Sequence, residues 1–123
     1  MNLIVDASVA VKWGVDEEGS DAAVHILQND DILAPDLMLI EYRNALLSNL
    51  RRGRISAEDA RQGERDLDGL EIQIVASRPF LRDAFALALE LSHPVYDCVY
   101  LAAAKATGRR LVTADRKFAS RIA

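Results

Sequence analysis

The sequence contains a single cysteine, Cys98, and only 3 prolines among its 123 residues. A lone thiol forms no internal disulfide, so we expect a protein of a reducing compartment, the cytoplasm. No apolar run approaches the roughly 18 residues that cross a bilayer. The opening residues, MNLIVDASVAVKW, have no basic segment ahead of their apolar stretch, which argues against a signal peptide.

Basic charge is also in short supply, with 15 Lys and Arg against 19 Asp and Glu and a net charge of −4. Such a balance ordinarily disfavours a nucleic-acid partner. Acids that cluster around divalent cations would, however, be neutralised by them, and the basic residues are grouped at 51–54 and 109–121. The net charge therefore neither predicts nor excludes a nucleic-acid substrate.

The length predicts one domain, 1–123, with its own hydrophobic core. Short apolar runs alternate with longer amphipathic segments, which predicts an α/β fold with a mainly parallel sheet. The order of the strands does not follow from this pattern. We expect strands at 2–6, 32–34, 72–75 and 111–113, helices at 8–14, 18–28, 36–52, 56–67, 80–91 and 95–107, and a helical turn from 115.

Several of these segments carry residues typical of helix ends. Polar residues favour the start of a helix and glycine its end. The expected signals are Ser8 at one start, Pro35 opening another helix, Ser56 with Asp59 as a capping box, and Gly53 and Gly108 just past two ends.

Acidic residues fall at informative places in this pattern. Asp6 ends the first strand and Asp115 follows the last one, and ligands bind beyond the carboxyl ends of parallel strands. Asp97 lies in the first turn of the 95–107 helix, where the helix dipole favours a carboxylate. Glu41 follows the apolar run 37–40, so its carboxylate starts on or beside a buried face.

Each acid also has a plain structural interpretation. Asp6, Asp97 and Asp115 are suitable helix caps, and Glu41 is within reach of a salt bridge with Arg43. Four converging carboxylates would repel one another and raise each other's pKa unless a hard cation such as Mg²⁺ or Mn²⁺ were bound. Metal ions held in this way activate water against a phosphodiester. Spacing alone leaves both interpretations open.

The segments around these acids resemble the PIN-domain family, and in particular the VapC-like toxins of toxin–antitoxin pairs. The resemblance covers nearly the whole chain, in family order. It is carried by VDASVAVKW at 5–13, APDLMLIEYRNALLSNLRRGRIS at 34–56, YDCVYLAAAKATG at 96–108 and LVTADRKFA at 111–119.

This resemblance implies a three-layer α/β/α domain and an endoribonuclease that uses Mg²⁺ or Mn²⁺ to activate water, leaving a 5′-phosphate and a 3′-hydroxyl. It also implies a homodimer and a VapB-like antitoxin that inserts a basic side chain among the acids. The family's acidic ligands map onto Asp6, Glu41, Asp97 and Asp115, and its orienting hydroxyls onto Ser8 and Thr113.

Some family members have a further acid after the fourth ligand. Here Arg116 and Lys117 occupy that neighbourhood, so we expect no fifth ligand, and one or two metal ions remain possible. The same two residues are candidates for contacts with the RNA backbone. A catalytically silent module that works only through its antitoxin and operator DNA is the alternative function. A receiver-like phosphoacceptor is disfavoured, because no aspartate follows the strand at 72–75.

The remaining candidate residues favour structural roles. Trp13, Tyr96 and Tyr100 could stack on bases, but packing in the core or a dimer is the better interpretation. His25 and His93 lack metal-ligand spacing to each other and to Cys98, so no zinc site is expected.

Overall fold

The structure, a computed structural model, describes all of residues 1–123. Its centre is a parallel sheet of four strands in the order β3-β2-β1-β4. The parallel arrangement that the alternating pattern predicts is confirmed, and the order is new information. The strands are β1 (Asn2–Val5), β2 (Asp31–Pro35), β3 (Gln73–Val75) and β4 (Arg110–Val112).

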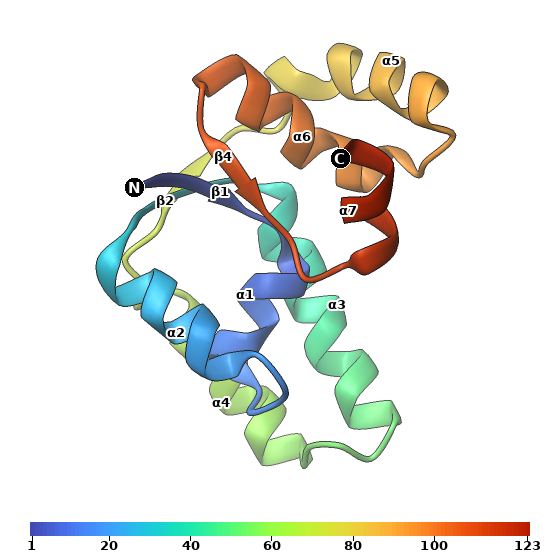
Figure 1. The fold of residues 1–123 in the computed structure, drawn as a ribbon. Coiled ribbons are helices and arrows are strands. Elements are labelled where there is room, and N and C mark those ends of the chain that lie inside the picture. Colours follow the sequence, from blue (N-terminus) through green and yellow to red (C-terminus); the bar gives the residue numbers. More distant parts are fainter.

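Seven α-helices and one short 3₁₀ segment connect and cover the strands (Figure 1). Every helix is either too short or too polar to cross a membrane. The helices are α1 (Ala7–Gly14), α2 (Ser20–Asn29), α3 (Leu37–Arg51), α4 (Ala57–Leu67), α5 (Leu81–Leu91), α6 (Val95–Thr107) and α7 (Arg116–Ile122), and η1 (Arg78–Phe80) precedes α5.

Neighbouring residues of β1 bury opposite faces of the sheet, as the pleat of a strand requires. Ile4 belongs to the large core cluster, together with Tyr100 of α6. Val5 belongs to a smaller cluster that includes Val9 of α1 and Ala23 of α2. Helices therefore cover both faces of the sheet (Figure 1), which confirms the three-layer α/β/α architecture.

The contact of α1 with α3 and α4 depends on close approach of the backbone. Tyr42 of α3 is fully buried, and its hydroxyl donates a hydrogen bond of 2.8 Å to the carbonyl of Gly63 in α4. A Cβ atom built at Gly14, the last residue of α1, would overlap the Tyr42 hydroxyl. Glycine at position 14 therefore lets the three helices meet below the sheet.

Most of the helix-end signals are confirmed. Ser56 and Asp59 form the expected capping box at the start of α4. Gly53 and Gly108 have φ angles of +71° and +67°, the left-handed conformation that glycine adopts most readily after a helix. These short-range signals work because each cap involves backbone groups only a few residues away.

Two local predictions are wrong. Ser8 lies inside α1, whose N-cap is Asp6, because the Asp6 carboxylate accepts the backbone N–H of Val9. Pro35 does not open α3 but ends β2, where it pairs with Val75. A proline fits there because the last residue of a strand can lack a donor without breaking the ladder behind it.

Candidate functional site

The four predicted acids line one pocket of about 300 Å³ at the carboxyl edge of the sheet. Asp6 and Asp115 follow β1 and β4, which are paired neighbours, so both side chains emerge at the same place. Glu41 comes from α3 and Asp97 from α6. We call this site the acidic pocket; it is lined by Asp6, Ala7, Ser8, Val11, Glu41, Asn44, Ala45, Ser48, Asp97 and Asp115.

Asp6 is the most deeply buried of the four acids, with 3% of its surface exposed. Its carboxylate accepts hydrogen bonds from the Ser8 hydroxyl at 2.5 Å and from the Val9 backbone at 3.3 Å. Burial raises the pKa of Asp6, an effect that these hydrogen bonds oppose and that the nearby Asp97 charge adds to. The protein thus places a carboxylate where its ionised form is disfavoured unless a positive charge is present.

Ser8 links the segments that follow the paired strands β1 and β4. Its hydroxyl lies 3.3 Å from that of Thr113 and accepts the backbone N–H of Ala114 at 2.8 Å. Thr113 in turn accepts the backbone N–H of Asp115 at 3.1 Å. Ser8 therefore contacts the Asp6 carboxylate directly, whereas Thr113 holds the main chain of Asp115 and not its side chain.

Asp115 has two roles: it caps a helix and it lines the acidic pocket. Its carboxylate accepts the backbone N–H of Phe118 at 3.1 Å and so caps the N-terminus of α7. It is also half-buried and lines the acidic pocket. The two interpretations that the sequence left open for this residue are compatible, since capping uses one carboxylate oxygen, Oδ1.

Glu41 is half-buried on α3 and accepts a hydrogen bond of 2.5 Å from the hydroxyl of Tyr100. Burial raises the pKa of Glu41, the Tyr100 bond opposes this, and the charges of Asp97 and Asp6 raise it further. The alternative salt bridge with Arg43 does not form, because Arg43 pairs with Glu64 of α4 at 2.8 Å. Glu41 is free of any basic partner.

Asp97 lies in the first turn of α6, as predicted. Its Oδ2 is 2.6 Å from Nε2 of His93, whose side chain is only 4% exposed. Sequence analysis assigned His93 no role at the site. The available signal was the four-residue spacing between His93 and Asp97, which Pro94 obscures because it separates the histidine from the helix.

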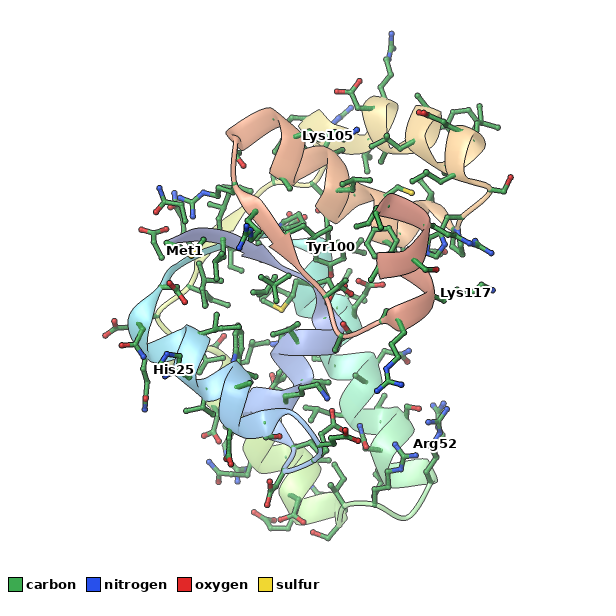
Figure 2. All side chains as sticks on the ribbon, viewed as in Figure 1. Met1, His25, Arg52, Tyr100, Lys105 and Lys117 are labelled. Atoms are coloured by element: carbon green, nitrogen blue, oxygen red, sulfur yellow. The ribbon has the colours of Figure 1, made fainter.

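Two polar residues that sequence analysis also missed, Asn44 and Ser48, lie on the same face of α3 as Glu41 and line the acidic pocket. Positions i, i+3 and i+7 share one side of a helix, so this spacing was the signal that could have found them. Arg116 and Lys117 are exposed at the start of α7, beside Asp115, and Lys117 extends outward from the helix (Figure 2).

The acidic pocket has the chemistry of a site for a hard divalent cation. Its charged lining residues are all carboxylates, with no lysine or arginine among them. Burial is the main cause of the raised pKa values of Asp6 and Glu41, and the neighbouring carboxylates add to it; a bound cation would favour the ionised form of both groups. Oxygen ligands of this kind suit Mg²⁺ or Mn²⁺.

The carboxylates are not yet gathered as ligands of one ion, because no three His, Cys, Asp or Glu side chains are grouped closely enough to hold a metal as they stand. The chemistry of the lining carboxylates fits a divalent cation, and joint ligation of one ion would require their side chains to close inward within the acidic pocket.

A larger groove of about 570 Å³ lies between α3 and α4. Its apolar residues include Leu46, Leu47 and Leu50, and its only acid, Glu64, is paired with Arg43. We call it the α3–α4 groove. It lacks a cluster of chemically active side chains, so the smaller acidic pocket is the candidate functional site.

The fold and the site together define the class of this protein: an α/β protein with a cluster of acids at the carboxyl edge of a four-stranded parallel sheet. The model of the PIN domain family matches residues 3–122. The chain therefore belongs to the PIN-domain family, and the resemblance drawn from the four sequence segments is confirmed.

Individual relatives agree with this assignment. The chain is 35% identical over 126 residues to Ribonuclease VapC3 of Pyrobaculum aerophilum, in an alignment that covers 98% of this chain and 95% of the relative. Among solved structures, it shares a TM-score of 0.73 and 14% identity with Mycobacterium tuberculosis VapC20, a Sarcin-Ricin loop cleaving toxin, covering 96% and 93% of the two chains.

A second solved structure contains VapBC2 from Rickettsia felis bound to a DNA fragment from their promoter. It matches with a TM-score of 0.64 and 13% identity, and the match covers 98% of this chain and 92% of that chain. At such low identity, the two solved structures show a shared fold.

Proposed function

We propose that this protein is a Mg²⁺- or Mn²⁺-dependent endoribonuclease and the toxin of a VapBC-like pair. The observation that supports the proposal most directly is the acidic pocket, which carboxylates from four separate parts of the chain line together, with no lysine or arginine among the lining residues. The name of the relative Ribonuclease VapC3 supports RNA as the substrate. The toxin assignment adds the cytoplasm as the place of action, where cellular RNA is available.

Asp6, Glu41, Asp97 and Asp115 are the proposed metal ligands. A divalent cation held there would supply positive charge for the scissile phosphate and for activation of the attacking water. The protein's own side chains orient the carboxylates that would hold the cation. Ser8 holds the Asp6 carboxylate and Tyr100 the Glu41 carboxylate, so both approach the acidic pocket in fixed directions.

RNA binding needs positive charge outside the acidic pocket, because the carboxylates repel a phosphate backbone. Arg116 and Lys117 are exposed directly beside Asp115 and are the proposed backbone contacts. They would hold the phosphates on either side of the cleavage site, while the scissile phosphate would lie at the cation held by the carboxylates.

The proposed partners are a VapB-like antitoxin and a second copy of the chain. A pocket lined with carboxylates and without lysine or arginine would accept a basic side chain from an antitoxin, which would compete with the metal ion. For the homodimer, α5 exposes a stripe formed by Leu81, Phe85 and Leu89, which are 47%, 61% and 69% exposed. Apolar residues at this spacing share one face, the pattern of a helix that packs against a partner.

The direct test is cleavage of an end-labelled RNA by the purified protein. We expect cleavage with millimolar Mg²⁺ or Mn²⁺, no cleavage in excess EDTA, and recovery when the ion is restored. The products should carry 5′-phosphate and 3′-hydroxyl ends, which kinase labelling with and without phosphatase distinguishes. Cleavage that continues in EDTA would refute metal dependence. A protein that binds its antitoxin and operator DNA but cuts no RNA under any condition would support the silent binding module.

A further inference from the structure

The Asp97 carboxylate is tied to the C-terminal helix through His93. Nη1 of Arg121, in α7, lies 2.9 Å from Nδ1 of His93, and Nε2 of the same ring lies 2.6 Å from Oδ2 of Asp97. No other protein group donates a hydrogen bond to this carboxylate. Arg121 of α7, His93 of the loop between α5 and α6, and Asp97 of α6 therefore form one continuous hydrogen-bonded chain that ends in the acidic pocket.

The direction of these hydrogen bonds follows from the chemistry of the partners. A guanidinium group only donates, so Nδ1 of His93 must be the acceptor of the Arg121 bond. In the neutral ring the proton then resides on Nε2, and this nitrogen donates to Asp97. Arg121 thus selects the histidine tautomer that can hold the carboxylate.

The position of the histidine ring is fixed from several sides. It stacks on Phe118 of α7, with ring centroids 4.8 Å apart and an angle of 23° between the planes. Arg121 also donates to the carbonyl of Ser92 at 2.7 Å. Ser92 ends α5 with a φ of +51°, an unusual value for a residue other than glycine, which turns the chain toward α6. Such a turn brings His93 opposite the first turn of the next helix.

We infer that His93, held by Arg121, is the positioning residue that orients Asp97 toward a divalent cation in the acidic pocket; this inference rests on the proposed function. Oδ2 is occupied by the histidine, which leaves Oδ1 for the ion. Groups that hold a ligating carboxylate raise metal affinity because they remove the freedom that the ligand would otherwise lose on binding. His93 is not among the residues that line the acidic pocket, so its effect on the ion would act through Asp97.

The test compares His93→Phe, His93→Gln and the control His25→Phe, with Mn²⁺ affinity measured by calorimetry in the absence of RNA. Phenylalanine keeps an aromatic ring that can stack on Phe118 but donates no hydrogen bond to Asp97. We therefore expect Mn²⁺ to bind ~10-fold more weakly. Glutamine can donate an amide N–H to Asp97, so affinity should recover to within ~3-fold of the unaltered protein. His25 is exposed on α2, and its replacement should change nothing.

Kinetics at a fixed, subsaturating Mn²⁺ concentration provide a second measurement. His93→Phe should lower kcat by about the same ~10-fold factor while the KM for RNA is unchanged, since no RNA contact is removed. Equal Mn²⁺ affinity in His93→Phe and in the unaltered protein would overturn the inference. Failure of the unaltered protein to bind Mn²⁺ at all would instead overturn the proposed function on which it rests.

A double-variant cycle separates positioning from general structural support. If His93 acts through Asp97, then His93→Phe should weaken Mn²⁺ binding no further when Asp97 is already asparagine. Independent, additive losses would contradict the inference. Should His93→Phe fold poorly, Arg121→Met removes the donor to Nδ1 and keeps the histidine; it should weaken Mn²⁺ binding ~3-fold, and unchanged affinity would also contradict the inference.

Discussion

Helix α3 presents two very different faces to its surroundings. Glu41, Asn44, Ala45 and Ser48 line the acidic pocket. Arg43, Leu46, Leu47 and Leu50 line the α3–α4 groove. Both sets follow the same i, i+3, i+4, i+7 spacing, and the second is displaced from the first by two residues, or about 200° around the helix.

The two faces of α3 differ in the charge of the residues that line them. The acidic pocket is lined by carboxylates with no lysine or arginine among them, and burial together with the neighbouring acids raises the pKa of Glu41. In the α3–α4 groove the one acid, Glu64, is paired with Arg43, and the leucines leave apolar surface open. A site under electrostatic strain should respond to metal ions and pH, whereas an apolar groove should respond to neither. This contrast can be tested by altering one face at a time.

The largest expected effect comes from removing a carboxylate of the acidic pocket. Asp97→Asn should reduce RNA cleavage by ~10³-fold or more, the scale of losing a catalytic group. Asp83→Asn is a matched control, because Asp83 occupies the first turn of α5 as Asp97 does that of α6, but is exposed and outside the pocket. Initial rates on a labelled RNA measure both, and full activity in Asp97→Asn would exclude it as a ligand.

Metal binding should stabilise the folded protein through the acidic pocket alone. At a Mn²⁺ concentration 100 times the Kd, mass action predicts a gain of ~2.7 kcal/mol in the free energy of unfolding. Glu41→Gln should lose most of this gain, since it removes one charge and can still accept the Tyr100 hydrogen bond. Thermal melts with and without Mn²⁺ measure the effect. A melt that neither Mn²⁺ nor Mg²⁺ shifts would favour the silent binding module.

Neutralising the buried charge of Asp6 should increase the stability of the folded protein even when no metal is bound. Because the pKa of Asp6 is raised, the folded state binds more protons than the unfolded state between about pH 4 and the raised value, and stability falls as pH rises through that window. Asp6→Asn keeps the cap of α1 and should raise the Tm at pH 7 in EDTA by ~3–6 °C, corresponding to ~1 kcal/mol.

This advantage of Asp6→Asn should shrink as the pH is lowered through the window and vanish below about pH 4, where the aspartate is protonated in both states. Asp16→Asn, at an exposed position, serves as the control and should stay within ~0.5 kcal/mol of the unaltered protein. A lower Tm for Asp6→Asn than for the unaltered protein at pH 7 would show that Asp6 is not under electrostatic strain.

The smallest effect is expected on the opposite face of α3. Leu47→Gln alters a residue of the α3–α4 groove that is already 46% exposed. We expect the free energy of unfolding to change by no more than ~0.5 kcal/mol, and RNA cleavage and the Mn²⁺-induced Tm shift to be unaffected. Urea unfolding and cleavage assays measure the two quantities. A tenfold loss of cleavage would mean that the two faces are coupled.

Much of the site was accessible from sequence because its signals are local. Asp6 directly follows a buried strand, and Asp97 lies in the first turn of a helix whose end Gly108 marks. The family resemblance then joined segments that periodicity could not connect. By contrast, Asn44, Ser48 and His93 were missed, since nothing in the neighbouring residues shows which side of a helix or turn faces a distant carboxylate.

The sequence by itself determined the strands, most of the helix ends and where the four acids fall relative to them, because caps and hydrophobic periodicity act over a few residues. Only the tertiary structure decided the strand order, the bond of Tyr100 to Glu41 across 59 positions, and the chain from Arg121 through His93 to Asp97. Such contacts depend on how whole elements pack, and packing is set by the combined burial of many side chains rather than by any one segment.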